Sequence, residues 1–226
     1  MKNLRDLEIN DLKKLLEEMG EKPFRAKQIY TWLHQNLVEH YEEMTNISKG
    51  LRDRLRTEYS VALPETVEVL SSKIDGTKKF IFRMQDGHVI ESVWMEYQHG
   101  HSVCISSQVG CRMGCKFCAS TLDGLARNLT SGEMLGQIYQ IQRTTGARVD
   151  NIVIMGSGEP LDNYDEFTRF IRMISDENGL HISRRNITIS TCGLVPRIRQ
   201  LADENYGITL ALSLHAPNDE TRKTLM

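Results

Sequence analysis

Three cysteines stand close together near the middle of the chain, at Cys111, Cys115 and Cys118. Thiolates this close repel one another unless a cation or a metal cluster absorbs their charge. A structural zinc site normally takes four ligands, whereas three ligands suit a [4Fe–4S] cluster that leaves one iron open for a substrate or cofactor. The C-x3-C-x2-C spacing therefore favours an iron–sulfur cluster.

Zinc is the alternative, and it would need a fourth ligand from Cys104, His99 or His101. The chain has five cysteines in 226 residues, with none before Cys104 and the fifth at Cys192. A secreted disulfide framework would spread its cysteines and follow a signal peptide, and the N-terminus has no apolar signal segment. The clustering points to metal or redox chemistry in a cytoplasmic protein.

The composition is that of an ordinary globular protein. There are 28 Lys and Arg residues against 30 Asp and Glu residues, and the mean hydropathy is -0.39. This balance excludes a disordered or fibrous chain. No window approaches the ~18 apolar residues that would span a bilayer, so we expect no membrane association. The near-neutral net charge gives no sign of a nucleic-acid partner and leaves room for a local basic face.

The elements that must position the cysteines alternate between strand and helix from about residue 102 onward. The expected strands are Ser102–Ser106, Asn151–Met155, Asn186–Thr191 and Ile208–Leu214. The first intervening helix opens on the capping box Thr130–Glu133 and stops at Gly146. This alternation predicts an α/β fold with a parallel sheet, open or closed into a barrel. Ligands bind at the carboxyl ends of such strands, where the cysteine loop lies.

The first hundred residues predict two further parts. Residues 1 to about 60 contain three amphipathic helical runs, the third opening at Thr45-Asn46. Residues 66–95 read as a three-stranded antiparallel meander with turns at Asp75-Gly76 and Asp86-Gly87. We therefore expect a helical domain over 1–62, an antiparallel β extension over 63–98 and an α/β domain over 99–226.

Several segments besides the cysteine loop match a known family in order. They are Lys22–Tyr30, Met44–Ser48, Cys104–Cys111, Met155–Leu161, Ser190–Pro196 and Leu212–Asp219. With Phe117 before the last loop cysteine, they resemble the RlmN family of radical S-adenosylmethionine (SAM) enzymes. The resemblance implies a partial radical-SAM (β/α)6 barrel, here incomplete, with an N-terminal helical accessory domain that binds RNA. It also implies a [4Fe–4S] cluster and SAM as cofactors, which together generate a 5′-deoxyadenosyl radical.

The resemblance assigns roles to named residues. Cys111, Cys115 and Cys118 would be the cluster ligands. The SAM-binding positions would be Gly158, Glu159, Ser190, Ser213, Leu214 and His215. Gly158 has no side chain to block a close approach of its backbone to a ligand. Two alternatives stay open: Glu159 as a capping carboxylate before Pro160, and His215 as a structural histidine after a strand.

Two further residues would act in catalysis. Strand alternation puts the side chain of Glu91 on the same face as those of Val89 and Val93. This face is apolar, so a carboxylate there needs a partner. The resemblance makes it the proton acceptor, and the alternative is an edge-strand glutamate that reaches solvent. Cys104 would be the resolving thiol, forming a transient disulfide with a methyl-carrying cysteine that the family has near its C-terminus. This sequence lacks that cysteine, and Cys192 is interpreted as buried and structural.

The activity implied is methylation of C2 of an adenine in 23S rRNA and in certain tRNAs through a methyl-cysteine intermediate. An external electron donor such as flavodoxin or ferredoxin would serve a monomeric enzyme. Candidate RNA contacts are Lys22, Arg25, Lys27, Arg52, Arg54 and Arg56, although a solvated helix face explains them equally well. Alternatives are a Cfr-type adenine-C8 methyltransferase and a zinc-stabilised RNA-binding module.

The last residues, Asp219–Met226, read as part of a helix with no stop signal. We therefore expect a barrel truncated after about four βα units. Without the methyl-carrying cysteine, we expect such a fragment to transfer no methyl group on its own.

Overall fold

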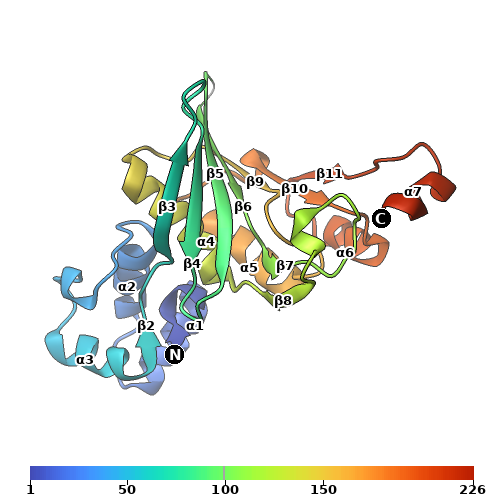
Figure 1. The fold of residues 1–226 in the computed structure, drawn as a ribbon. Coiled ribbons are helices and arrows are strands. Elements are labelled where there is room, and N and C mark those ends of the chain that lie inside the picture. The colour runs from blue at the N-terminus through green and yellow to red at the C-terminus, as the bar shows by residue number, and fades with distance from the viewer. Residues whose placement is uncertain (99) are drawn as a thin grey trace.

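A seven-stranded mixed sheet forms the centre of the computed structural model, which describes residues 1–98 and 100–226 (Figure 1). The strand order is β11-β10-β9-β6-β5-β4-β3. The parallel strands are β6 (Gly100–Ile105), β9 (Asn151–Ile154), β10 (Ile187–Thr191) and β11 (Thr209–Leu212). The antiparallel strands are β3 (Glu65–Ser71), β4 (Lys78–Arg83) and β5 (Val89–Tyr97), and β5 also runs antiparallel to β6. The predicted meander is therefore continuous with the parallel sheet.

Each parallel strand leads to a helix. The helices are α4 (Ser131–Thr145), α5 (Tyr164–Ile174), α6 (Val195–Glu204) and α7 (Asp219–Leu225). Figure 1 shows α4 and α5 behind the strands and α7 at the far end of the molecule. Val103 and Ile152 are buried on the helix side of the sheet, whereas their neighbours Cys104 and Val153 face the other side and are only partly buried. The expected α/β fold with a parallel sheet, an incomplete barrel, is confirmed.

Local signals define the ends of α4 as the sequence predicted. The Thr130 side chain accepts a hydrogen bond from the Glu133 N–H, and the Glu133 carboxylate accepts one from the Thr130 N–H. Gly146 ends the helix in the left-handed conformation, with φ 70°. Both caps depend on contacts within a few residues, which is why sequence alone could place them.

The N-terminal part contains α1 (Ile9–Glu18), α2 (Phe24–His34) and α3 (Lys49–Glu58). The third helix begins later than predicted, because the Ser48 hydroxyl, and not Thr45-Asn46, accepts a hydrogen bond from the Leu51 N–H. The Asn46 side chain instead accepts a hydrogen bond from Trp32 Nε1 at 2.6 Å. A tertiary contact thus removes Asn46 from the capping role.

Several short elements were not predicted. Strands β7 (Gln108–Gly110) and β8 (Leu125–Asn128) form a hairpin that flanks the cysteine loop. Strands β1 (Lys2–Asn3) and β2 (Tyr59–Ser60) pair in parallel at the N-terminal end. The 3-10 turns are η1 (Leu4–Asp6), η2 (Tyr41–Glu43), η3 (Ala119–Thr121) and η4 (Arg184–Asn186). Among the described residues, no helix is long and apolar enough to cross a membrane.

Candidate cofactor site

An open pocket lies where the parallel strands end, and most of the predicted cofactor positions line it. They are Cys111, Cys115, Cys118, Gly158, Glu159, Ser190, Ser213 and His215. Of the predicted positions, Leu214 lies outside this lining, with its side chain 57% exposed. The Leu214 carbonyl accepts a hydrogen bond from Arg222 Nε at 3.2 Å, which ties the segment after β11 to α7. The strand-end arrangement expected from sequence thus brings segments from four parts of the chain together.

The three loop thiols form one side of the pocket. Cys111 and Cys115 are buried, and Cys118 is half-buried. Burial raises the pKa of the Cys111 and Cys115 thiols, and the charge of the neighbouring thiols raises it further. The Thr121 hydroxyl donates to the carbonyls of Cys115 and Cys118 at 3.1 and 2.8 Å and fixes the turn between them. Three thiolates in this place need a strongly positive group to hold them deprotonated.

The donor set of these thiols suits a [4Fe–4S] cluster with one open iron, which three thiolates can hold, better than a structural zinc ion, which takes four ligands. A zinc ion bound at about 2.3 Å draws its thiolates to within roughly 4 Å of one another. Within residues 1–98 and 100–226, no three His, Cys, Asp or Glu side chains are grouped so that they could hold one metal ion. A cuboidal cluster instead binds each thiolate through a different iron atom, so its ligands are spread further apart.

The proposed fourth zinc ligands lie elsewhere. His101 is near the start of β6, at the opposite end of that strand from the loop, and its ring stacks on Trp94 with centroids 4.6 Å apart. Its Nδ1 lies 3.0 Å from the Arg148 carbonyl oxygen. Cys104 is part of β6 itself, and His99 lies outside the described residues. The zinc alternative therefore finds no assembled ligand set among the residues described.

Glu159 holds two strand ends together. The side chain is buried, and its oxygens accept hydrogen bonds from the N–H groups of Leu161 at 3.1 Å and Cys192 at 2.8 Å. The capping alternative for this carboxylate is therefore present in the structure, although the residue also lines the pocket. Its two backbone partners link the segment after β9 to the segment after β10.

The position of Gly158 requires a glycine because the backbone of Gln108 lies close to it. Its φ is 102°, and an added Cβ would lie 2.7 Å from the backbone nitrogen of Gln108. The absence of a side chain thus allows a close approach to β7, and Gly158 also lines the pocket. A side chain here would push the β9 segment away from the strand that leads into the cysteine loop.

The remaining wall comes from the ends of β10 and β11. The hydroxyl oxygens of Ser190 and Ser213 lie 3.0 Å apart and share a hydrogen bond. His215 has a left-handed backbone with φ 57°, and its ring contacts that of Phe117 with centroids 4.7 Å apart. The aromatic residue of the cysteine loop thus reaches the segment after β11, and both residues line the pocket.

Glu91 is not in an apolar environment, so that expectation is wrong. Its side chain is 56% exposed and pairs with Lys79 Nζ at 2.5 Å, and Val89 on the same face is half exposed. Of the alternative, the edge strand is wrong, because β5 lies between β4 and β6, but the glutamate does reach solvent. Glu91 lies on the face of the sheet opposite the helices. No helix among the described residues covers this face.

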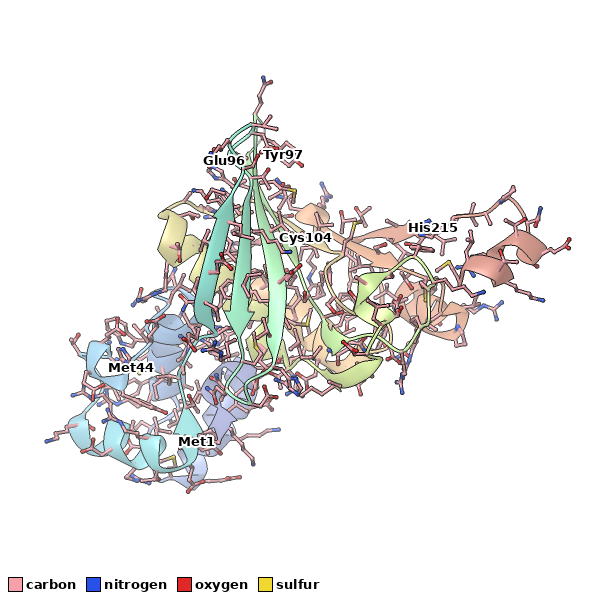
Figure 2. The ribbon with its side chains drawn as sticks, in the orientation of Figure 1. Met1, Met44, Glu96, Tyr97, Cys104 and His215 are labelled. Atoms are coloured by element: carbon pink, nitrogen blue, oxygen red, sulfur yellow. The ribbon has the colours of Figure 1, made fainter. Side chains whose placement is uncertain are left out.

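Cys104 shares this open face. It pairs with Val93 of β5, two residues from Glu91, so the two side chains point to the same side. Figure 2 shows Cys104 within the sheet and His215 further out, toward the C-terminal end of the chain. Burial raises the pKa of the Cys104 thiol. All five cysteines are free thiols in this structure.

Cys192 is the residue that sequence reasoning missed. It was interpreted as buried and structural, but it is only half-buried and lines the pocket together with the loop thiols. The signal was its place directly after Thr191, at the carboxyl end of a parallel strand, where side chains meet a ligand site.

The arginines of the N-terminal helices have intramolecular partners. Arg52 donates to the Tyr41 and Glu42 carbonyls, and Arg54 donates to the Met19 carbonyl. Arg56 pairs with Glu42 at 2.5 Å, and Arg25 donates to the Asn46 carbonyl at 3.1 Å. These contacts lie within the helical part, and the side chains of Arg54 and Arg56 are about half exposed, as a solvated helix face would have them.

A three-thiol loop that faces polar strand ends in a partial α/β barrel defines a radical SAM type of cofactor site. The model for the radical SAM superfamily matches residues 105–226, and the model for the ribosomal RNA large subunit methyltransferase N-terminal domain matches residues 2–61. The chain belongs to the RlmN family of the radical SAM superfamily. Membership implies a [4Fe–4S] cluster and SAM as cofactors, and the three loop thiols fit the cluster.

Individual relatives agree with this placement. A probable dual-specificity RNA methyltransferase RlmN from Lachnoclostridium phytofermentans is 62% identical over 99% of this chain and 63% of its own length. One of the same description from Clostridium novyi is 50% identical over 100% of this chain and 66% of its own length. The crystal structure of a radical SAM methyltransferase from Sphaerobacter thermophilus has a TM-score of 0.94 and 41% identity, covering 100% of this chain and 67% of that one. The chain thus spans about two-thirds of the length of these relatives.

Proposed function

We propose that the chain provides the cofactor-binding part of an RNA methyltransferase that adds a methyl group to C2 of an adenine in 23S rRNA and in certain tRNAs. The observation that carries the proposal is the three-thiol loop facing the ends of β9, β10 and β11. The relatives named dual-specificity RNA methyltransferase RlmN favour C2 over the Cfr-type C8 alternative. They also disfavour a zinc-stabilised RNA-binding module.

The pocket residues divide the work of holding the cofactors. Cys111, Cys115 and Cys118 would bind the cluster, which together with SAM supplies one-electron radical chemistry when bound. The proposed SAM positions are Gly158, Glu159, Ser190, Ser213, Leu214 and His215. Through its backbone partners, Glu159 fixes the distance between the ends of β9 and β10. The Ser190–Ser213 hydrogen bond fixes the end of β11 against that of β10.

Glu91 and Cys104 are proposed to act on the substrate from the open face of the sheet. Glu91 would accept the proton that leaves the RNA adduct, and Lys79 would keep its carboxylate oriented. Cys104 would resolve the adduct by forming a transient disulfide with the methyl-carrying cysteine, which this sequence lacks and the C-terminal part of the relatives would supply. The bond between that sulfur and the RNA-bound carbon breaks, and the carbon keeps the electron pair and takes up a proton. Their common face supports this pairing of roles, since groups that act on one substrate atom must reach it from the same side.

The partners follow from the same family placement. We propose 23S rRNA and tRNA as substrates, a small electron-transfer protein such as flavodoxin or ferredoxin as electron donor, and a monomeric enzyme. We divide the chain into a helical part over residues 1–62, a β extension over 63–98 and the barrel over 99–226. The helical part would contact the RNA backbone. Lys22, Lys27 and Lys49 are exposed candidates for phosphate contacts.

Anaerobic reconstitution with iron and sulfide tests the cofactor part. We expect a brown protein with four irons per chain ([4Fe–4S]). After one-electron reduction with dithionite, its electron paramagnetic resonance spectrum should change when SAM is added. Cys118→Ala should abolish the cluster, whereas Cys192→Ala should keep it. A colourless protein that takes up one zinc ion would contradict the proposal.

A chimera tests the position of methylation. The chain is joined to the C-terminal third of the Lachnoclostridium phytofermentans relative and incubated with adenine-containing RNA from cells that lack this modification. Mass spectrometry of the digested RNA should detect 2-methyladenosine, and Cys118→Ala in the chimera should give none. Detection of 8-methyladenosine instead would support the Cfr-type alternative.

A further inference from the structure

Arg112 joins the cysteine loop to the opposite wall of the pocket. It follows Cys111 directly, and its guanidinium donates two hydrogen bonds to Asp162, from Nε to Oδ2 at 2.8 Å and from Nη2 to Oδ1 at 2.5 Å. Asp162 belongs to the segment after β9 that also carries Gly158 and Glu159. The side chain of Arg112 is 60% exposed, whereas that of Asp162 is 12% exposed. The arginine therefore reaches inward to a fixed carboxylate.

Gln108 holds that carboxylate in place. Its buried side-chain nitrogen donates to Asp162 Oδ2 at 2.9 Å and to Asn128 Oδ1 at 2.8 Å. Its side-chain oxygen accepts a hydrogen bond from the Glu159 N–H at 2.8 Å. One amide thus connects β7, β8 and the segment after β9, with both of its polar atoms satisfied.

The electrostatics of Asp162 agree with this geometry. Partial burial acts to raise the pKa of its carboxyl group, but the hydrogen bonds from Arg112 and Gln108 outweigh it and hold the pKa below the usual value. Asp162 is therefore a carboxylate at neutral pH. A bidentate arginine–carboxylate pair of this kind fixes direction as well as distance.

We propose that Asp162 is a positioning residue that latches the cysteine loop, through Arg112, to the wall formed by Gly158 and Glu159. The latch keeps Cys111 and Cys115 turned into the pocket before any cofactor binds. That the latch assists cluster binding rests on the proposed function, whereas its effect on the exposure of the loop thiols does not. Because Arg112 is 60% exposed and the pair joins two segments outside the strands, its loss should open the loop without unfolding the sheet.

Thiol labelling of the cluster-free protein tests the latch. The protein is treated with a maleimide under anaerobic, reducing conditions, and each cysteine is followed by peptide mass spectrometry. In Asp162→Ala and in Arg112→Ala we expect Cys111 and Cys115 to react at least about tenfold faster than in the unchanged protein. Cys104, within β6, should keep its rate. Equal rates at Cys111 and Cys115 in all proteins would overturn the proposal.

Two comparisons separate a latch from general destabilisation. The double variant should label no faster than Asp162→Ala, because that substitution already removes the ion pair with Arg112. Glu65→Ala breaks the Arg83–Glu65 ion pair, 3.0 Å long and far along the chain from the loop, and should leave loop labelling unchanged. If Asp162→Ala also makes Cys104 react faster, that variant is generally destabilised, and the test then depends on Arg112→Ala, which changes an exposed side chain. If Cys111 and Cys115 react at unchanged rates in Arg112→Ala, the latch is overturned.

Cluster uptake then distinguishes the latch from the proposed function. If the unchanged protein takes up a cluster, Asp162→Ala should bind less iron after the same reconstitution or lose the spectral change caused by SAM. Uptake and spectrum identical to the unchanged protein would overturn the latch. If the unchanged protein takes up no cluster, the proposed function is wrong. The maleimide labelling rates then decide alone whether the latch exists.

Discussion

At the scale of single residues, Cys192 shows how its surroundings determine what a thiol can do. Its backbone N–H donates to Glu159, and the thiol lies in the same pocket as the cluster cysteines. Burial, followed by the charge of Glu159, raises the pKa of the Cys192 thiol to about 12. It therefore differs from an ordinary exposed cysteine, whose pKa is about 8.5.

This predicts the pH dependence of alkylation at Cys192. A raised pKa keeps the thiol protonated, so in the cluster-free protein its rate with iodoacetamide should still be rising at about pH 10. An ordinary thiol levels off above about pH 9. Glu159→Gln removes one cause of the shift and should move the profile to lower pH. A rate at Cys192 that levels off below pH 9 in the unchanged protein would contradict the prediction.

At the scale of elements, what could be predicted depends on how local each signal is. The limits of α4 follow from contacts within the segment, and the parallel strands follow from their apolar runs. The β7–β8 hairpin has strands of three and four residues, too short for a periodic pattern, and it closes around an intervening loop. The exposure of Glu91 depends on which face of the sheet the helices cover. The three loop cysteines could be singled out from sequence because three thiols at this spacing have few other uses.

The β7–β8 hairpin depends on Gly110, the residue before the first cluster cysteine. Its φ is 74°, and an added Cβ would lie 2.0 Å from the Gly124 carbonyl oxygen, the acceptor of the Cys111 N–H. Gly110→Ala should therefore lower the free energy of unfolding by about 2–4 kcal/mol and expose the loop thiols to labelling. Urea denaturation and maleimide labelling measure the two effects.

Gly87→Ala is the matched control for this hairpin. Gly87 also has a positive φ, 89°, but an added Cβ would meet no atom within 4 Å. It should cost only the backbone strain, about 1 kcal/mol, and leave loop labelling unchanged. Equal losses in the two variants would mean that the contact with Gly124 does not hold the loop.

At the scale of the whole molecule, the N-terminal helices and the barrel share one hydrophobic core. Polar contacts join them as well: Asp6 accepts a hydrogen bond from the Gly132 N–H of α4 at 3.0 Å, and His34 Nδ1 lies 2.8 Å from the Tyr139 hydroxyl. Figure 1 shows α1 and α2 gathered below one end of the sheet, near α4. A part that binds RNA would therefore be rigidly placed relative to the cofactor pocket.

Gly132 is the point where this joint is tightest. An added Cβ would lie 2.9 Å from the backbone carbonyl carbon of Arg5 and 2.4 Å from Asp6 Oδ1. Gly132→Ala should therefore destabilise the protein by about 1–3 kcal/mol, although alanine favours a helix by about 1 kcal/mol over glycine. Chemical denaturation measures the loss, and the transition should stay single because both parts unfold together.

Gly50→Ala separates the joint from helix propensity. Gly50 and Gly132 are each the second residue of their helix, α3 and α4, but an added Cβ at Gly50 meets nothing within 4 Å. Gly50→Ala should therefore stabilise the protein by about 0.5–1 kcal/mol. Because the two substitutions are chemically identical and occupy the same helical position, opposite signs can come only from the contact with Arg5 and Asp6. Equal stabilisation in both variants would show that the N-terminal segment moves easily to admit the methyl group, and the N-terminal helices would then not be rigidly held against the barrel.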